Sequence, residues 1–203
     1  MKSNHKKQNK QTKLNQVRIV GGQFKRRNIN FINADGLRPT PDRMRETLFN
    51  WLMHDIFDAN VLDACAGSGV LGFEALSRGA GKVTFIEANT QQAHQLKQTA
   101  TDLRLASEQF DIHSAKAETT INATHKQIFN IVFIDPPYSL NLWQPIIDGL
   151  LTNQLINEDS LLYIESNKAI EAIFDEKTLK KIHIVKQKTM GQVFSWVIKL
   201  THS

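Results

Sequence analysis

The sequence predicts an α/β protein with a doubly wound, mostly parallel sheet. From residue 60, short apolar segments alternate with helix-length segments, as in parallel βαβ units. A glycine-rich loop joins the first of these apolar segments to the first helix-length segment. Only KTMG separates the last two apolar segments, so they are expected to form an antiparallel hairpin.

The apolar segments are the expected strands of the sheet. They read NVLDA (60–64), KVTFIE (82–87), QFDIH (109–113), IFNIVFID (128–135), SLLYIES (160–166), KKIHIVKQ (180–187) and QVFSWVIKL (192–200). Helices are expected from about Gly69, from about Thr90, over 143–151 and, as a short piece, over 169–174.

A smaller unit precedes this alternation. VRIVGG and QFKRRNINFI are expected to be two strands of a hairpin around Gly21 and Gly22, with cationic polar positions. An amphipathic helix follows, with Thr40 as its N-cap and Pro41 at its first position. We therefore expect a tail over 1–15, an extension over 16–58 and a main domain over 59–203.

Composition excludes several classes of protein. Hydrophobic residues make up 41% of the 203 residues, which is typical of a folded globular chain. No apolar run approaches the roughly 20 residues of a membrane span, and no secretory signal begins the chain. Cys65 is the only cysteine, and the seven histidines lack metal-ligand spacing. A cytoplasmic protein without membrane or metal sites is expected.

Positive charge is concentrated at the N-terminus. Nine of the 25 lysines and arginines precede Asp35, the first acidic residue, so the remaining 16 face all 20 acidic residues. These nine are Lys2, Lys6, Lys7, Lys10, Lys13, Arg18, Lys25, Arg26 and Arg27. Such an arm suits a polyanion such as RNA, because neutralised phosphates release counterions. A disordered, solvated tail that only aids solubility is an equal alternative for residues 1–14.

The loop VLDACAGSGVLG allows two cofactors. Gly67, Gly69 and Gly72 match GxGxxG, and Glu87 ends the next strand where it could accept ribose hydroxyls, which by itself suits a nicotinamide dinucleotide. Asp63, four residues before Gly67, favours S-adenosylmethionine instead. A carboxylate there repels a diphosphate but attracts the ammonium group of the methyl donor.

The segment FIDPPYS offers a clamp for an amine. Asp135 can accept an N–H bond from an exocyclic base nitrogen, and the Pro136 carbonyl can accept the other hydrogen. The two prolines fix the backbone, and Tyr138 can stack on the base. Its strand is expected to lie beside the strand ending at Asp63, so both segments would share one cleft.

These segments resemble the bacterial 16S rRNA guanine-N2 methyltransferases. The resemblance runs from about Val17 to Leu200 and rests on RIVGGQFKRR, GLRPTPDRMRETLFNWL, LDACAGSGVLGFEALSRGA, FIDPPY, YIES and GQV. It implies a Rossmann-like, class I S-adenosylmethionine-dependent methyltransferase whose seven-stranded sheet ends in an antiparallel strand. It also implies methyl transfer to N2 of guanine 966, with 16S rRNA in the 30S subunit or an assembly intermediate as partner, by a monomer.

The resemblance also implies which residues form the site. The cofactor-binding residues would be Asp63, Gly67, Ser68, Gly69 and Glu87, and the catalytic residues Asp135, Pro136 and Tyr138. The RNA-binding residues would be Arg18, Lys25, Arg26, Arg27, Arg38, Thr40 and Arg43.

Three positions qualify the resemblance. Ala115 stands where many relatives have a polar side chain for the adenine amino group. Tyr138 replaces a frequent phenylalanine, and either ring can stack. Glu165 ends the fifth strand near the cleft, where a structural ion pair is an equal expectation.

Three other functions remain open from the sequence. A DNA adenine-N6 methyltransferase would use the same clamp, although 203 residues leave little room for a target-recognition domain. An RNA-binding or assembly protein without catalytic activity could use this fold. A nicotinamide-dependent dehydrogenase is the remaining alternative.

Overall fold

The computed structural model describes residues 14–32, 39–124 and 127–201. Their strands are β1 (Leu14–Arg18), β2 (Asn28–Ile32), β3 (Asn60–Asp63), β4 (Lys82–Ile86), β5 (Phe110–His113), β6 (Ile131–Ile134), β7 (Leu161–Ser166), β8 (Ile182–Met190) and β9 (Val193–Leu200). The α-helices are α1 (Asp42–Trp51), α2 (Val70–Ser77), α3 (Thr90–Asp102), α4 (Ala117–Ala123), α5 (Trp143–Thr152) and α6 (Glu176–Leu179). Short 3-10 helices are η1 (Ser107–Gln109), η2 (Tyr138–Leu140) and η3 (Ile170–Ala172).

Seven strands form one sheet in the order β5-β4-β3-β6-β7-β9-β8. Pairing is parallel from β5 to β7, and β9 is antiparallel to both of its neighbours. The strand order reverses between β3 and β6, which are hydrogen-bonded to each other. The predicted sheet, its antiparallel last strand and the pairing of these two strands are confirmed. A reversal of this kind opens a crevice at the carboxyl ends of the strands.

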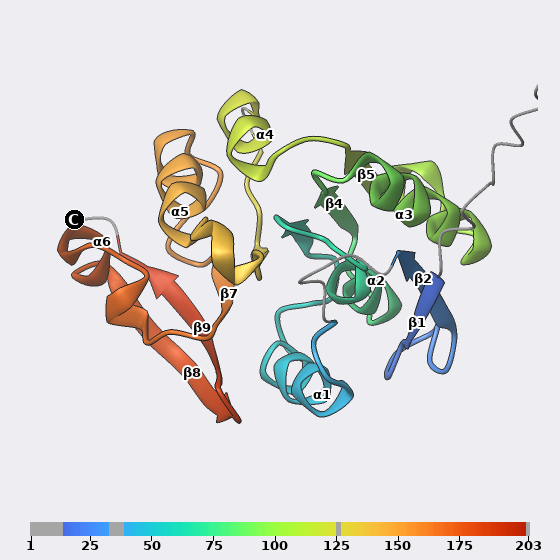
Figure 1. Cartoon of the computed structure of the whole chain (residues 1–203), viewed down its shortest axis with the longest axis horizontal. Coiled ribbons are helices and arrows are strands. Elements are labelled where there is room, and N and C mark those ends of the chain that lie inside the picture. The colour runs from blue at the N-terminus through green and yellow to red at the C-terminus, as the bar shows by residue number, and fades with distance from the viewer. Residues whose placement is uncertain (1–13, 33–38, 125–126, 202–203) are drawn as a thin grey trace, which may run out of the picture.

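Helices cover both faces of the sheet (Figure 1). Successive strand residues point to opposite faces, so each strand contributes to two cores. Val61 and Phe133 belong to the core under α1, α2 and α3, whereas Leu62 and Ile134 belong to the core under α4 and α5. Because both faces are covered, these strands are apolar throughout rather than alternating. No described helix is long and apolar enough to cross a membrane.

The N-terminal hairpin differs from its prediction. β1 and β2 pair antiparallel, but Gly21 and Gly22 lie inside a longer connection over 19–27 rather than in a tight turn. That connection packs on the end of α2, where Ser77 accepts from the backbone N–H of Gln23 at 2.7 Å and donates to the carbonyl of Gly21 at 2.5 Å. Contacts with α2 therefore fix the loop.

Two other boundaries also differ. Helix α1 begins at Asp42 with Pro41 as its N-cap residue, so Thr40 does not cap it. The C-terminal strands extend through KTM, which leaves a two-residue turn at Gly191 and Gln192. Gly191 has a φ of 62°, a left-handed conformation that glycine adopts without strain.

Candidate active site

Three acidic side chains meet at the carboxyl ends of β3, β6 and β7. Asp63 ends β3 and is in register with Phe133 on β6, two residues before Asp135. Ile134 is in register with Ile164 on β7, so Asp135 and Glu165 occupy neighbouring positions on adjacent strands. The glycine loop and the DPPY segment therefore follow neighbouring strands at the carboxyl edge of the sheet, and this edge is here termed the crevice.

The glycine loop follows β3 and turns the chain into α2. Gly67 and Gly69 have φ angles of 51° and 73°, the left-handed region where a side chain would be strained. A Cβ on Gly72 would lie 2.2 Å from Cε1 of Phe85 on β4. Glycine is thus required for the turn and for the close packing of α2 against the sheet.

Asp63 lies beneath this loop. It is 3% exposed and accepts a hydrogen bond from the N–H of Gly72 at 3.1 Å. Burial and the negative charge of Glu87 raise its pKa to about 7, although the Gly72 hydrogen bond opposes the change. Without a cationic partner Asp63 is therefore partly protonated near neutral pH, whereas the sequence suggested a fixed anion.

Glu87 and Ser68 are both held by backbone groups of neighbouring segments. Glu87 follows β4, and its two oxygens accept from the N–H groups of Gly67 at 2.8 Å and Asn89 at 2.7 Å. Burial raises its pKa. Ser68 is buried, and its hydroxyl accepts from the N–H of Val70 at 3.3 Å. This bond holds the Ser68 side chain at the start of α2.

Four carboxylates surround Cys65, which follows β3. Burial raises the pKa of its thiol, and the negative charges of Asp63, Asp135, Glu87 and Glu118 raise it further. A thiol with so high a pKa is not a nucleophile at neutral pH. Glu118 was not singled out from the sequence, yet its Oε2 is buried without a partner among the described residues. Its position just after the HSAKA segment is the only sequence signal for it.

Asp135 and Tyr138 form the wall of the crevice on the β6 side. Burial and the charges of Glu165 and Asp63 raise the pKa of Asp135 well above its usual value, whereas a hydrogen bond with the side chain of Thr40 lowers it. The Tyr138 hydroxyl donates to Oε1 of Glu165 at 3.4 Å. This bond fixes the direction of the ring.

Glu165 makes hydrogen bonds with two tyrosines. Its Oε2 accepts from the Tyr163 hydroxyl at 2.7 Å, and no lysine or arginine among the described residues lies within 4 Å of its carboxylate. Burial raises its pKa. Trp143 donates its indole N–H to the Glu165 carbonyl at 2.9 Å. The alternative of a structural ion pair therefore has no partner within the described part of the chain.

The residues expected to contact RNA from the RPTPDR segment lie in different places. Arg38 is outside the described residues. Thr40 is 3% exposed, and its side chain lowers the pKa of both Asp135 and Glu165, which argues against a phosphate contact for it. Arg43 is exposed on the first turn of α1, as an RNA contact requires.

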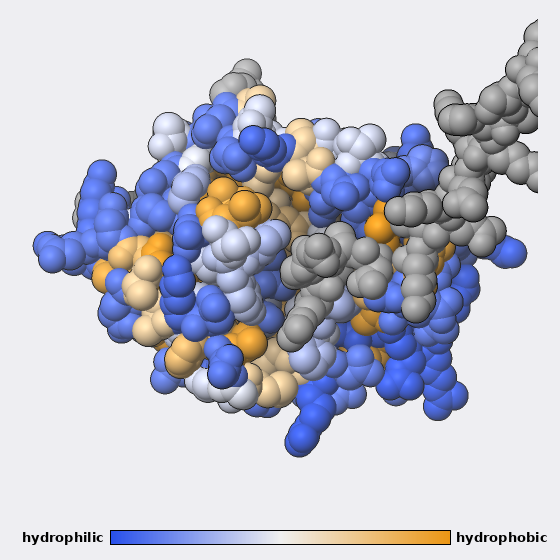
Figure 2. Space-filling view, in the orientation of Figure 1, coloured by the Kyte–Doolittle hydropathy of each residue, from blue (hydrophilic) through white to orange (hydrophobic). Residues whose placement is uncertain are grey.

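The basic hairpin residues lie far from the crevice. Lys25, Arg26 and Arg27 are exposed, and Nη2 of Arg27 donates to the carbonyl of Asp102 at the end of α3. The carboxyl ends of α2 and α3 are at the opposite edge of the sheet from the crevice. These helices have 8 and 13 residues, so the separation is roughly 12 to 20 Å at 1.5 Å per residue. On the face in Figure 2 the β1–β2 hairpin is covered by hydrophilic residues.

A buried ion pair joins the extension to the main domain. Arg45 and Glu74 are both 0% exposed, and Nη1 of Arg45 lies 2.5 Å from Oε1 of Glu74. Glu74 also accepts from the N–H of Val20, and Arg18 pairs with Asp42 at 2.8 Å. Sequence reasoning missed Arg45, although its spacing from Leu48 and Leu52 puts it on the buried face of α1.

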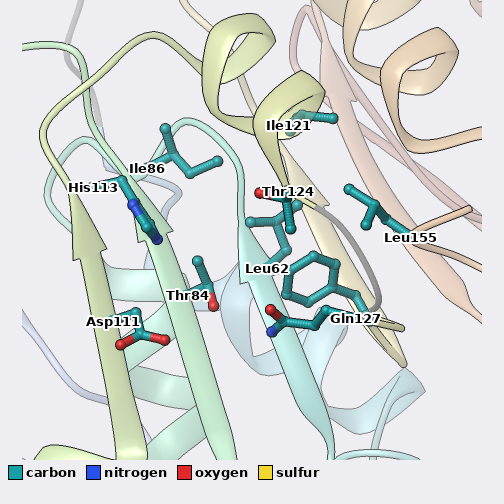
Figure 3. A pocket seen from close by; sticks show the side chains of 10 residues that line it. Leu62, Thr84, Ile86, Asp111, His113, Ile121, Thr124, Gln127 and Leu155 are labelled. Atoms are coloured by element: carbon teal, nitrogen blue, oxygen red, sulfur yellow. The ribbon is translucent and has the colours of Figure 1, made fainter. Parts of the chain in front are cut away.

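A separate cavity of about 190 Å³ is not lined by Asp63, Asp135 or Glu165 (Figure 3). It opens between α4 and the strands β3, β4 and β5. Leu62, Ile86 and Phe129 form its apolar wall, and the buried hydroxyl of Thr84 faces it without a partner in the described part of the chain. None of the residues predicted to bind cofactor or RNA lines it.

Comparison with known proteins identifies the family of this chain. Residues 17–199 match the family model described as conserved hypothetical protein 95. Ribosomal RNA small subunit methyltransferase D of Haemophilus influenzae is 41% identical over 179 residues, which cover 88% of this chain and 91% of that protein. Its Escherichia coli K12 counterpart is 41% identical over 151 residues, covering 74% and 75%.

Solved structures agree. A putative methyltransferase from Escherichia coli is 33% identical and has a TM-score of 0.80, covering 92% of this chain and 98% of its own. The predicted Rossmann-like methyltransferase fold is thereby confirmed. The chain belongs to the family described as conserved hypothetical protein 95, whose members include relatives named ribosomal RNA small subunit methyltransferase D.

Proposed function

We propose that this protein transfers a methyl group from S-adenosylmethionine to the exocyclic N2 of guanine 966 in 16S rRNA. The observation that carries the proposal is the juxtaposition of Asp135 and Tyr138 with the glycine loop across the β3–β6 pair. Relatives that are 41% identical are named as small-subunit rRNA methyltransferases, which supports the RNA substrate. A ribosomal substrate would be met in the cytoplasm.

The residues present fit a cationic donor that carries an adenosine group. Asp63 is a buried carboxylate that a donor ammonium would ionise, and Glu87 keeps free lone pairs for ribose hydroxyls. The unpartnered Oε2 of Glu118 can accept from the adenine amino group. That contact would replace the polar side chain missing at Ala115. The bound donor supplies a methyl group on a positively charged sulfur, which leaves as a neutral thioether.

The DPPY segment would orient the amine. A guanine N2 is a weak nucleophile because its lone pair is delocalised into the ring. Asp135 accepts one N–H and the Pro136 carbonyl accepts the other, so the lone pair points toward the methyl carbon. Tyr138 stacks on the base, with its hydroxyl tied to Glu165. When the N–C bond forms, N2 releases a proton to the Asp135 carboxylate.

Asp135 must therefore be ionised for transfer. Its raised pKa makes it a stronger proton acceptor than an exposed aspartate, but it also leaves less carboxylate at low pH. Activity should rise with pH as Asp135 ionises. No metal and no covalent bond between enzyme and base is required in this scheme.

Product analysis tests the proposal directly. The protein is incubated with labelled methyl donor and one of three substrates: small ribosomal subunits, protein-free 16S rRNA or duplex DNA. The nucleic acid is then digested and its nucleosides are separated by mass spectrometry. We expect N2-methylguanosine from ribosomal RNA, none with Asp135→Ala, and normal yield with the control Asp148→Asn, which changes an exposed residue of α5.

Two results would reject the proposal. Methylated adenine in DNA would identify a DNA enzyme, and transfer undiminished by Asp135→Ala would show that the clamp has no catalytic role. Calorimetry measures whether the Asp135→Ala variant still binds the methyl donor, and binding shows that the variant is folded. We also propose that residues 16–58 form an extension that grips RNA and that residues 59–203 form the catalytic domain.

A further inference from the structure

Lys168 lies beside the DPPY segment. It follows β7 by two residues, close to Glu165, and is exposed. Its Nζ donates to Oδ1 of Asn141 at 2.8 Å, and Asn141 directly follows η2, which begins with Tyr138. The ammonium group is therefore held at the edge of the crevice by a neutral partner.

Lys188 reaches the same edge from β8. Lys188 is in register with Ser195 on β9, and Ser195 is in register with Glu165 on β7. Neighbouring strands are about 4.8 Å apart, so the backbone of Lys188 lies roughly 10 Å from that of Glu165. Its Nζ donates to the hydroxyl of Thr47 on α1 at 2.8 Å.

Arg43 completes this side of the crevice. It is exposed and lies three residues after the buried Thr40, whose side chain is near enough to Asp135 and Glu165 to lower the pKa of both. Figure 1 shows α1 between the β1–β2 hairpin and the β8–β9 hairpin. Three segments far apart in the sequence thus bring one cation each to the border of the crevice.

These three positive charges are not neutralised within the described protein. No Asp or Glu oxygen among the described residues lies within 4 Å of Arg43, Lys168 or Lys188. Arg18, by contrast, pairs with Asp42 at 2.8 Å. Cations held by neutral groups keep their full attraction for an external anion, and a phosphate chain is the anion that an RNA enzyme meets.

We propose that Arg43, Lys168 and Lys188, here termed the rim cations, bind backbone phosphates of the nucleotides that flank the target base. The inference rests on the proposed function and assigns the part of its RNA interface next to the chemistry. Lys25, Arg26 and Arg27, termed the loop cations, lie roughly 12 to 20 Å away along α2 and α3. They contact only RNA long enough to extend across that distance.

Two triple variants with equal loss of charge separate these surfaces. One replaces the rim cations with alanine, and the other replaces the loop cations. Each is measured for binding to a short RNA hairpin bearing the target guanine and to the small ribosomal subunit, over a range of salt concentrations. Thermal melting and donor affinity of each variant establish that it is folded, and Lys188→Gln guards against loss of the contact with Thr47.

The rim variant should bind the short hairpin at least tenfold more weakly, and its salt slope should fall by roughly 0.7 to 0.9 per lost phosphate contact. The loop variant should bind the short hairpin like wild type and lose affinity only for the subunit. Wild-type affinity of the rim variant for the hairpin, or an equal loss by the loop variant, would overturn the inference. Failure of the proposed function would appear separately, as RNA binding by the wild-type protein without methylated guanine.

Discussion

Replacing Asp63 with asparagine should make the empty protein more stable at neutral and higher pH. Asparagine keeps an oxygen for the N–H of Gly72 but carries no charge to bury. The pKa of Asp63 rises from 3.8 to about 7 on folding. A difference of about three pH units at about 1.4 kcal/mol each means that the buried charge costs on the order of 4 kcal/mol.

The pH dependence has a definite sign. The folded pKa lies above the unfolded value, so protonated Asp63 favours folding below pH 3.8, and this contribution is lost as the pH rises through about 7. Asp63→Asn should therefore melt like wild type near pH 4. At pH 8 it should melt roughly 8 to 16 °C higher, because 1 kcal/mol shifts the melting temperature of a protein of this size by about 2 to 4 °C.

Thermal melts by tryptophan fluorescence at pH 4, 6 and 8 measure this difference. The exposed Asp55→Asn serves as control and should follow wild type at every pH. S-adenosylmethionine should raise the melting temperature of wild type but have little effect on Asp63→Asn, which lacks the anion for the ammonium group. A difference between Asp63→Asn and wild type that does not grow with pH would refute the reasoning.

Three further variants test other contacts. Glu165→Gln removes a charge that raises the pKa of Asp135, so the pH at which methyl transfer rises should move down. Thr40→Val removes a group that lowers this pKa, so it should move the same pH up. If both variants shifted the pH profile in the same direction, the reasoning would be contradicted. Arg45→Met leaves Glu74 buried without its partner and should lower the free energy of unfolding in urea by about 3–5 kcal/mol. Gly72→Ala places a Cβ against Phe85 and should lower the free energy of unfolding by about 1–3 kcal/mol. A loss below about 0.5 kcal/mol would show that Phe85 can move to make room for the methyl group.

The sheet and the crevice could be predicted because their signals are local. Apolar segments of strand length, turn residues and a reversal of strand order place Asp63 and Asp135 together without knowledge of side-chain packing. The same rule brings Glu165 to the crevice, since it also follows the apolar run of a parallel strand.

Contacts between distant segments could not be predicted in this way. The position of Thr40 against Asp135 depends on the path of a segment before α1, and the pairing of Arg45 with Glu74 depends on how α1 packs on α2. The N-terminal cations were predicted to contact RNA, but the sequence did not predict where they lie, because charge alone carries no position. The hairpin runs along α3, which takes Arg27 to its far end.

A crystal structure with S-adenosylmethionine bound tests the central claim most directly. The account predicts the donor ammonium at Asp63, the ribose hydroxyls at Glu87 and the methyl group directed at the space between Asp135 and Tyr138, where a base nitrogen could approach to about 3–3.5 Å. A donor whose methyl group points away from Asp135, or that occupies the cavity beside Thr84 instead, would contradict it.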